Sequence, residues 1–315
     1  MGWLINPYRF KLTQSGYIFA GTNDNLGPIN KRVAFTKDLI NWEETLLTDN
    51  NDNHIYYASD YSSSLKRGVI LGSRGNYAYS NDLINWTSSN FGNNSFIIRD
   101  CVRSEQQDLF IAVGDGGFGI AKSSDGIIWN RINSTEMLCV AYSPTLDKFV
   151  TLNQNGGLIS SDGTNWSGIT LPTSRYQKVI WIDSLNIFYA IGGLSLDGTN
   201  FARSSNGINW TASTMPGSGV RNHLSIAYSD VEGIFMLSAT LRTVTGTFNR
   251  IYTSTNGITW TLRNTTNRFW DLIWSDRLNK FLGCESGGFT SSDGITWVND
   301  IPTYYNNIFN TITEL

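Results

Sequence analysis

The sequence predicts an all-β fold, a seven-bladed β-propeller with four-stranded antiparallel blades, and three observations point to it. A polar turn followed by a tryptophan recurs seven times, with successive tryptophans 37 to 50 residues apart. Each repeat also holds short runs of β-branched and aromatic residues, and no sustained helical period interrupts them. A repeat of about 40 to 45 residues with four strand signals is typical of propeller blades. We therefore expect one domain that spans residues 1–315.

The recurring turn reads "FTKDLINW", "YSNDLINW", "KSSDGIIW", "SSDGTNW", "RSSNGINW", "TSTNGITW" and "TSSDGITW". Asp-Gly and Asn-Gly tolerate positive φ, so we predict a two-residue hairpin whose Ser or Thr hydroxyl and Asp or Asn side chain bond backbone groups. The first two copies carry Leu39 and Leu83 instead of Gly, and there we expect a different turn that the Asp still caps. The repeat residues to which we assign a structural role are Asp38, Trp42, Asp82, Trp86, Asp125, Trp129, Asp162, Trp166, Asn206, Trp210, Asn256, Trp260, Asp293 and Trp297.

The four strands of a blade follow from the pattern around each turn. Innermost strands are expected at runs such as "CVAYSPT", "VIWIDS", "SIAYSD" and "DLIWSD", and second strands at "KFVTL", "IFYAIGG", "IFMLSA" and "KFLGC". The third strand enters the turn, and the fourth begins near the tryptophan, whose ring should be buried as a wedge between sheets. After the last turn, "IFNTIT" has the spacing of another innermost strand, while "YRFKL" and "YIFAG" precede the first turn. Pairing of the two ends would close the ring, and the sequence leaves open which strand each end supplies.

Composition excludes several classes of function. Charged residues make up 16% of the chain, and a net charge of -3 gives no basic footprint for nucleic acid. The sequence contains neither a signal-peptide pattern nor an apolar stretch of 18 residues, so no membrane insertion is expected and the location stays open. Cys101, Cys139 and Cys284 lie far apart in apolar runs, so we interpret them as small buried hydrophobes. Neither a metal nor another cofactor is predicted, because no ligands have the required spacing.

Around residues 291–297 the chain resembles the Asp-box propellers, the superfamily that includes sialidases and photosystem II assembly factors. The motif of that superfamily reads Ser-x-Asp-x-Gly-x-x-Trp, whereas Asp293 and Gly294 are adjacent here, so the loop is one residue shorter. The resemblance extends over the whole chain through the repeats, and it implies that these turns lie at the outer rim, where their role is structural. The repeats are also similar to those of phage, large-virus and uncharacterised bacterial propellers, which implies a virion-associated or host-attachment role.

Candidate ligand-binding residues lie where the innermost strands should begin, around the central channel. A sialidase mechanism needs three arginines, a tyrosine nucleophile and a glutamate, and the sequence offers no such set in the correct blades, so no catalytic residue is assigned. A two-carboxylate glycosidase would use Asp100, Glu136 or Asp271. Tryptophans beside the inner strands could stack on a sugar or pack in the channel. The possible channel-mouth site comprises His54, Arg99, Asp100, Lys178, His223, Arg268 and Asp271.

These observations favour a non-catalytic binding or structural propeller, with a protein or a glycan as its partner. A glycan-binding lectin or a sialidase-like glycoside hydrolase at the channel mouth is one alternative. An assembly or scaffold factor is the other. Fold alone does not decide among them, but a lectin should show similar aromatic pockets in several blades, whereas an enzyme should show converging carboxylates in one pocket.

Overall fold

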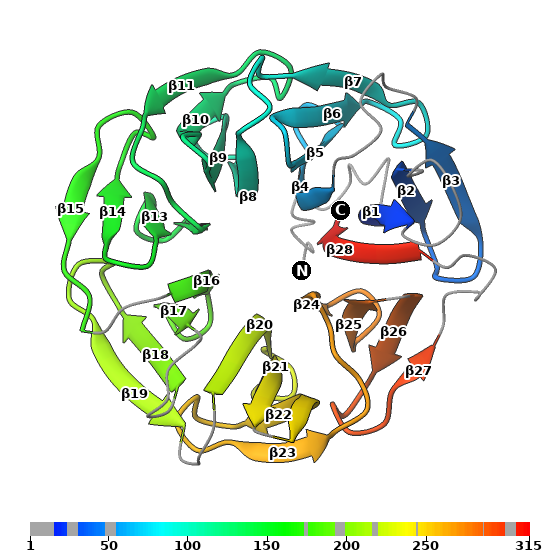
Figure 1. Cartoon of the computed structure of the whole chain (residues 1–315), viewed down its shortest axis with the longest axis vertical. Helices are drawn as coiled ribbons and strands as arrows, with labels where there is room; N and C mark the ends of the chain where they lie inside the picture. The colour runs from blue at the N-terminus through cyan, green and yellow to red at the C-terminus, as the bar shows by residue number, and fades with distance from the viewer. Residues whose placement is uncertain are drawn as a thin grey trace, which may run out of the picture.

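The chain forms a ring of seven four-stranded antiparallel sheets around a central channel, as the predicted seven-bladed propeller requires (Figure 1). In the described part of the chain every regular element is a β-strand. No helix among these residues is long and apolar enough to cross a membrane. The computed structural model describes residues 16–23, 31–47, 55–172, 176–192, 199–215, 220–243, 245–285, 287–299 and 307–315.

One strand of each sheet lines the channel. The expected innermost runs fall on these strands, and "CVAYS" coincides with β12. The neighbouring inner strands contact one another around the ring, so residues on them face a shared central space. The seven inner strands are β4 (Tyr56–Ser62), β8 (Ile97–Ser104), β12 (Cys139–Ser143), β16 (Tyr176–Ile182), β20 (Val220–Ser229), β24 (Asp271–Ser275) and β28 (Asn307–Glu314).

The other strands follow in order from the channel to the rim. The second strands are β1 (Tyr17–Asn23), β5 (Arg67–Gly72), β9 (Leu109–Asp115), β13 (Lys148–Leu152), β17 (Ile187–Gly192), β21 (Ile234–Thr243) and β25 (Lys280–Glu285). The third strands are β2 (Lys31–Thr36), β6 (Asn76–Ser80), β10 (Gly119–Ser123), β14 (Gly157–Ser160), β18 (Thr199–Ser204), β22 (Gly246–Ser254) and β26 (Gly287–Ser291). The rim strands are β3 (Trp42–Leu46), β7 (Thr87–Asn90), β11 (Asn130–Asn133), β15 (Ser167–Ile169), β19 (Thr211–Met215), β23 (Thr261–Asn264) and β27 (Val298–Asn299).

The two ends of the chain close the ring within one sheet. The C-terminal strand β28 is the innermost strand, and it pairs antiparallel with β1, Phe19 lying opposite Ile312. The predicted "IFNTIT" strand is confirmed, and so is the strand at "YIFAG", while "YRFKL" lies outside the described residues. The N-terminal segment therefore supplies the second, third and rim strands of this sheet. Backbone pairing of segments from opposite ends closes the ring, and β28 takes the innermost place that an inner strand takes in each of the other sheets.

The polar turn is held by two side chains, as the third copy shows. The hydroxyl of Ser123 accepts the backbone N–H of Gly126 at 2.8 Å, and Oδ1 of Asp125 accepts the N–H groups of Ile127 and Ile128 at 2.9 and 2.8 Å. Within this turn Gly126 alone has a positive φ, of 71°. The expected two-residue hairpin is wrong, because the carboxylate collects N–H groups beyond the glycine and holds a wider loop between β10 and β11.

The two leucine copies adopt the same turn as the glycine copies, so the different turn expected there is also wrong. Leu39 and Leu83 have φ values of 62° and 65°, and the N–H of Leu83 donates to the Ser80 hydroxyl as the glycine N–H groups do. The reason is burial, since Leu83 is only 2% exposed. Its side chain fills space beside Gly68. Gly68 is at the strand position that Phe110 occupies in the next sheet, so the leucine lies where the other sheet has a phenylalanine ring. Burying the leucine offsets a left-handed conformation that costs about 1–2 kcal/mol.

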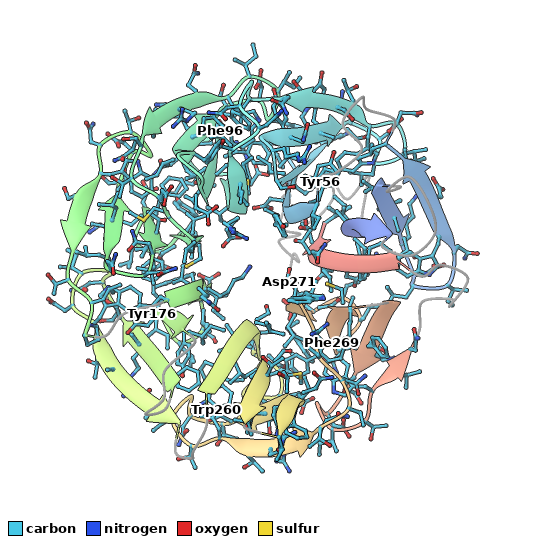
Figure 2. All side chains as sticks on the ribbon, in the orientation of Figure 1. Tyr56, Phe96, Tyr176, Trp260, Phe269 and Asp271 are labelled. Carbon is cyan, nitrogen blue, oxygen red and sulfur yellow. The ribbon has the colours of Figure 1, made fainter. Side chains whose placement is uncertain are left out.

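The recurring tryptophans pack between sheets, as predicted. Trp129 belongs to an apolar cluster with Phe110 of its own sheet and Val69 of the preceding one. Trp260 stacks on Phe201 of the preceding sheet with ring centroids 5.1 Å apart, and Figure 2 shows it near the rim. The seven indoles are half-buried, and each packs on an apolar cluster whose residues come from two neighbouring sheets. The three cysteines are free and buried, in agreement with their interpretation as small hydrophobes.

Candidate functional site

Three charged side chains from alternate sheets meet inside the central channel. Nζ of Lys178, on β16, lies 3.6 Å from Oδ1 of Asp100 on β8 and 3.8 Å from Oδ1 of Asp271 on β24. The side chains are 27%, 12% and 10% exposed respectively. Figure 2 shows Asp271 at the inner edge of the ring. The three residues lie on the inner strands themselves, whereas the sequence analysis placed them in the loops that lead into those strands.

Asp100 also ties its strand to the next one around the ring. Its Oδ1 accepts the N–H of Cys101, and its Oδ2 accepts the N–H of Val140 on β12 at 3.1 Å. A carboxylate that accepts backbone N–H groups from two strands satisfies donors that would otherwise be buried without a partner. The carboxylate therefore has a structural role in addition to its contact with Lys178.

Asp271 makes the corresponding connection at the closure of the ring. Its Oδ1 accepts the N–H of Leu272 and the hydroxyl of Ser225, and its Oδ2 accepts the N–H of Ile312 at 3.2 Å and the hydroxyl of Thr311 at 3.4 Å. The bonds to Ile312 and Thr311 reach β28, the strand that the C-terminus supplies. One carboxylate therefore connects three consecutive inner strands.

Asp60 on β4 repeats this arrangement, and no ion pair joins it to a cation among the residues that the structure describes. Its Oδ1 accepts the N–H of Tyr61, and its Oδ2 accepts the N–H of Arg103 on β8 at 2.7 Å. Burial raises the pKa of Asp60 to about 7, against the lowering effect of the two backbone hydrogen bonds. Asp60 is not among the predicted site residues, although an acidic residue inside an otherwise half-buried strand was a usable signal.

Burial and the neighbouring charges act together on the pKa values of Asp100 and Lys178. Burial raises the pKa of Asp100, and the nearby Lys178 ammonium opposes that rise. Burial also acts to lower the pKa of Lys178, but Asp100 and Asp271 together hold it above its usual range. Lys178 therefore remains an ammonium ion between the two carboxyl groups across the neutral pH range.

The channel opens through two mouths, which we name after the inner strands: the start mouth, where these strands begin, and the end mouth, where they end. At the start mouth a cavity of about 110 Å³ reaches Asp100, Lys178 and Asp271. Asp100 and Lys178 also line a larger cavity, of about 650 Å³, toward the end mouth. The trio therefore lies between the two mouths. Residues from or beside all seven inner strands line the small cavity, among them Tyr57, Arg99, Leu138, Gln177, Leu224, Trp270 and Asn310.

Two predicted arginines lie at the start mouth, paired with acids other than the trio. Arg99 bonds Asp115 at 3.0 Å and lies over the ring of Tyr57. Arg268 approaches Glu285 at 3.4 Å and lies 4.3 Å from the ring centroid of Trp270. Their positive charges are thus compensated locally, and each guanidinium supports an aromatic ring beside the cavity.

The remaining predicted positions are not brought together with the trio by any described contact. His54 lies outside the described residues. His223 lies on β20, opposite Ala239 of β21, and Arg221 is on the same strand. Glu136 precedes β12 and accepts the N–H of Gly117 in the turn between β9 and β10. Among the residues that the structure describes, no group of three or more His, Cys, Asp or Glu residues could hold a metal ion.

Four consecutive inner strands, β12, β16, β20 and β24, carry an aromatic ring at one repeated position near the end mouth. Each ring packs on the phenylalanine seven residues later, with centroids 4.6 to 4.8 Å apart. A second cavity, of about 300 Å³, lies there between β16, β20 and β24. The repeated "AYS", with "IWI" and "IWS" at the matching places of the other two strands, was the sequence signal for this group of aromatics. Its members are Tyr142, Trp181, Tyr228 and Trp274.

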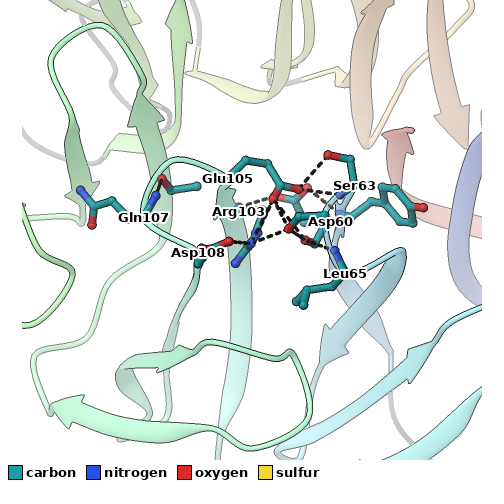
Figure 3. A network of polar contacts seen from close by, with 11 residues as sticks. Asp60, Ser63, Leu65, Arg103, Glu105, Gln107 and Asp108 are labelled. Carbon is teal, nitrogen blue, oxygen red and sulfur yellow. Dashed lines mark hydrogen bonds and ion pairs between the residues drawn. The ribbon is translucent and has the colours of Figure 1, made fainter. Parts of the chain in front are cut away.

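An ion-pair network occupies the aromatic position of β8 (Figure 3). Arg103 is 2% exposed, bonds Glu105 and Asp108 at 3.0 Å each, and lies 5.0 Å from the ring centroid of Phe110. Glu105 in turn accepts the N–H of Ser63 in the turn after β4. The network joins two neighbouring sheets at the end mouth. The sequence carries no signal for it, because the partners come from separate turns.

The fold and the channel define a seven-bladed propeller with a charged centre and two distinct mouths. Several solved structures are similar to the chain. YCF48 bound to a D1 peptide has a TM-score of 0.59 and 15% identity, over 92% of this chain and 93% of that chain. A catalytically inactive virginiamycin B lyase from Staphylococcus aureus with quinupristin has a TM-score of 0.62 and 11% identity, over 82% and 88%. The WD40 propeller domain of Doa1 has a TM-score of 0.53 and 10% identity, over 88% and 95%.

No protein-family model matches the chain, and no curated protein matches it. At 10 to 15% identity the likeness to these structures shows the fold alone.

Proposed function

We propose that the chain is a non-catalytic binding propeller that takes its ligand at a mouth of the central channel. The observation that carries this proposal is the engagement of the channel carboxylates. Asp100 and Asp271 each accept backbone N–H groups from two strands, and both contact the Lys178 ammonium. Because these side chains already hold the inner strands together, they are not available to bind a ligand. The two mouths of the channel are then the surfaces where a ligand can bind.

A glycoside hydrolase is the second candidate, because Asp100 and Asp271 converge on one ammonium. Such enzymes use one protonated acid and one carboxylate that flank the scissile bond, with room for the sugar between them. Here Lys178 lies between the two carboxyl groups, which are 12% and 10% exposed. An ammonium held there occupies the space between the two carboxyl groups that a sugar would have to enter. This arrangement favours binding.

The class of partner is part of the proposal. The match to YCF48 with a bound peptide supports a protein partner, such as an assembly or scaffold role would use. The repeated aromatic positions at the end mouth are a feature that a lectin would also use. A virion-associated attachment role rests on the resemblance of the repeats to phage and large-virus propellers.

The test uses the purified full chain against peptide and glycan arrays and a panel of aryl glycosides. We expect binding to an array member that is lost when end-mouth side chains are changed and retained in Asp100→Asn, without glycoside turnover. Hydrolysis of a glycoside that Asp271→Asn abolishes, with the circular dichroism spectrum unchanged, would overturn the proposal in favour of the hydrolase.

A further inference from the structure

We propose that the end-mouth cavity between β16, β20 and β24 binds arginine or lysine side chains of a basic peptide segment from a partner protein. The inference rests on the proposed binding function and specifies its site and the chemistry of its ligand. It is independent of the channel trio, because the residues that carry it lie at the ends of three consecutive inner strands and in the turns that follow them.

The cavity is lined by the same pair of side chains in each of three consecutive sheets. An aromatic ring at the end of the inner strand is followed two residues later by an aspartate. The rest of the lining is apolar, and no lysine or arginine belongs to it among the described residues. The cavity therefore combines π faces with negative charge. The three pairs are Trp181 with Asp183, Tyr228 with Asp230, and Trp274 with Asp276.

The two indoles are fixed in place before any ligand binds. Nε1 of Trp181 donates to Oδ1 of Asp183 at 2.6 Å, and Nε1 of Trp274 donates to Oδ1 of Asp276 at 2.8 Å. Phe188 packs edge-on against Trp181 with the ring planes at 62°. Phe281 makes the same edge-on contact with Trp274. Each ring is thus held with its carboxylate at its edge, and little side-chain freedom is lost on binding.

The surrounding charges leave the cavity acidic. Asp230 accepts the hydroxyl of Ser184 and remains exposed at the mouth. The nearest basic neighbour in sequence, Arg277, is directed to another sheet, since its guanidinium lies 4.6 Å from the ring centroid of Tyr17 and its Nε donates to the Tyr17 hydroxyl.

This combination fits a guanidinium or ammonium group better than a neutral sugar. A guanidinium stacks on an aromatic face and at the same time donates in its plane to a carboxylate, so one side chain satisfies both features of a pair. Three pairs in consecutive sheets offer positions for more than one basic residue of an extended segment. The 650 Å³ cavity shares Trp181 and Asp183 with this one, so the segment can continue toward β12.

The test is fluorescence anisotropy of a labelled peptide with alternating arginine and glycine, compared with the same peptide in which citrulline replaces arginine. We expect the arginine peptide to bind and the citrulline peptide to bind at least about tenfold more weakly, since citrulline keeps the shape and loses the charge. Asp276→Asn should weaken binding about fivefold, and Trp274→Leu by a similar or larger factor. Because Trp274 packs on Phe281, Trp274→Phe serves as a second variant that keeps a π face and should retain most of the affinity.

The matched control is Glu43→Gln on the rim strand β3, which removes one exposed charge far from the channel. If Glu43→Gln weakens binding as much as Asp276→Asn, the attraction is unspecific charge and the inference is wrong. Equal binding of the citrulline peptide would also overturn it. Binding of a neutral oligosaccharide alone, weakened by Trp274→Leu, would refute the basic ligand and leave the binding function standing. Glycoside turnover that Asp271→Asn abolishes would overturn the binding function itself.

Discussion

The ammonium of Lys178 lies 3.8 Å from a carboxylate oxygen of Asp271, although β16 and β24 belong to sheets separated by a third. The contact crosses the channel and does not follow the wall from one sheet to its neighbour. A single side chain thus connects positions that the packing of adjacent sheets leaves apart. Asp100 contacts the same ammonium. A change in the charge of Lys178 therefore affects both carboxyl groups at the centre of the ring.

Replacing Lys178 by methionine should destabilise the ring, because Asp100 and Asp271 would face each other across the channel without a cation. We expect a loss of about 1–3 kcal/mol in the free energy of unfolding, less than for a fully buried pair because all three groups retain contact with water. Denaturant unfolding at pH 7 measures it. The triple variant Lys178→Met, Asp100→Asn, Asp271→Asn should be more stable than Lys178→Met alone. Equal stability of the wild type and Lys178→Met would show that the trio contributes nothing.

Replacing Asp271 by alanine should loosen the C-terminal strand in particular. The carboxylate accepts the N–H of Ile312 and the hydroxyl of Thr311, so its removal takes two hydrogen bonds from β28. The ladder with β1 and the side-chain bonds to Ser59 of β4 and Ser275 of β24 remain. Hydrogen exchange followed by mass spectrometry should show faster exchange in peptides that cover 307–314, with little change in β12. Uniform acceleration around the ring would contradict a local role for this carboxylate.

Leu83 and Gly68 should behave as a coupled pair. Leu83→Gly relieves a positive φ but empties a buried site, so we expect a net loss of about 1–3 kcal/mol in stability. Adding Gly68→Phe to that variant copies the combination of Gly126 and Phe110 in the next sheet and should recover part of the loss. A double-mutant cycle in denaturant gives the coupling energy. Additive effects would mean that the two sites do not share one space.

Asp60 should make stability fall as the pH rises. Its pKa is about 7 in the folded chain against an ordinary value of 3.8, so the folded state binds the extra proton between these values. Stability from this group is therefore full below about pH 4, is lost as the pH rises toward 7, and is constant above it. The difference in melting temperature between the wild type and Asp60→Asn should decline across that window, by the equivalent of about 1–3 kcal/mol. A difference that does not change with pH would place the pKa of Asp60 near its ordinary value.

Most of the fold followed from local pattern. Short apolar runs, the seven polar turns and the tryptophans fixed the number of sheets, the number of strands in each and the rim position of the indoles, because each feature depends on residues close in sequence. The turn geometry was predicted less well. Leu83 adopts a conformation that its own residue type disfavours, and the compensating space beside Gly68 lies on a different strand. The backbone preference of leucine is outweighed by packing against residues that are distant in the sequence.

The residues of the candidate site could likewise be selected from the sequence, but their contacts with one another could not. Asp100, Lys178 and Asp271 were selected for their position near the start of inner strands, but their mutual contacts join residues from three different sheets. Nor did the sequence pair Arg99 with Asp115, or Trp181 with Asp183 at the end mouth, where the repeated aromatic position was the available signal. The spacing of repeats indicates which residues are equivalent and does not indicate which of them meet.

By itself, then, the sequence determined a closed ring of seven like units, because turn chemistry and strand alternation act within a few residues. The tertiary structure alone decided which end supplies the innermost strand, where the central charges converge, and that one mouth combines aromatic rings with carboxylates. Those outcomes depend on distances across the channel, and such distances exist only after every sheet has taken its place in the ring.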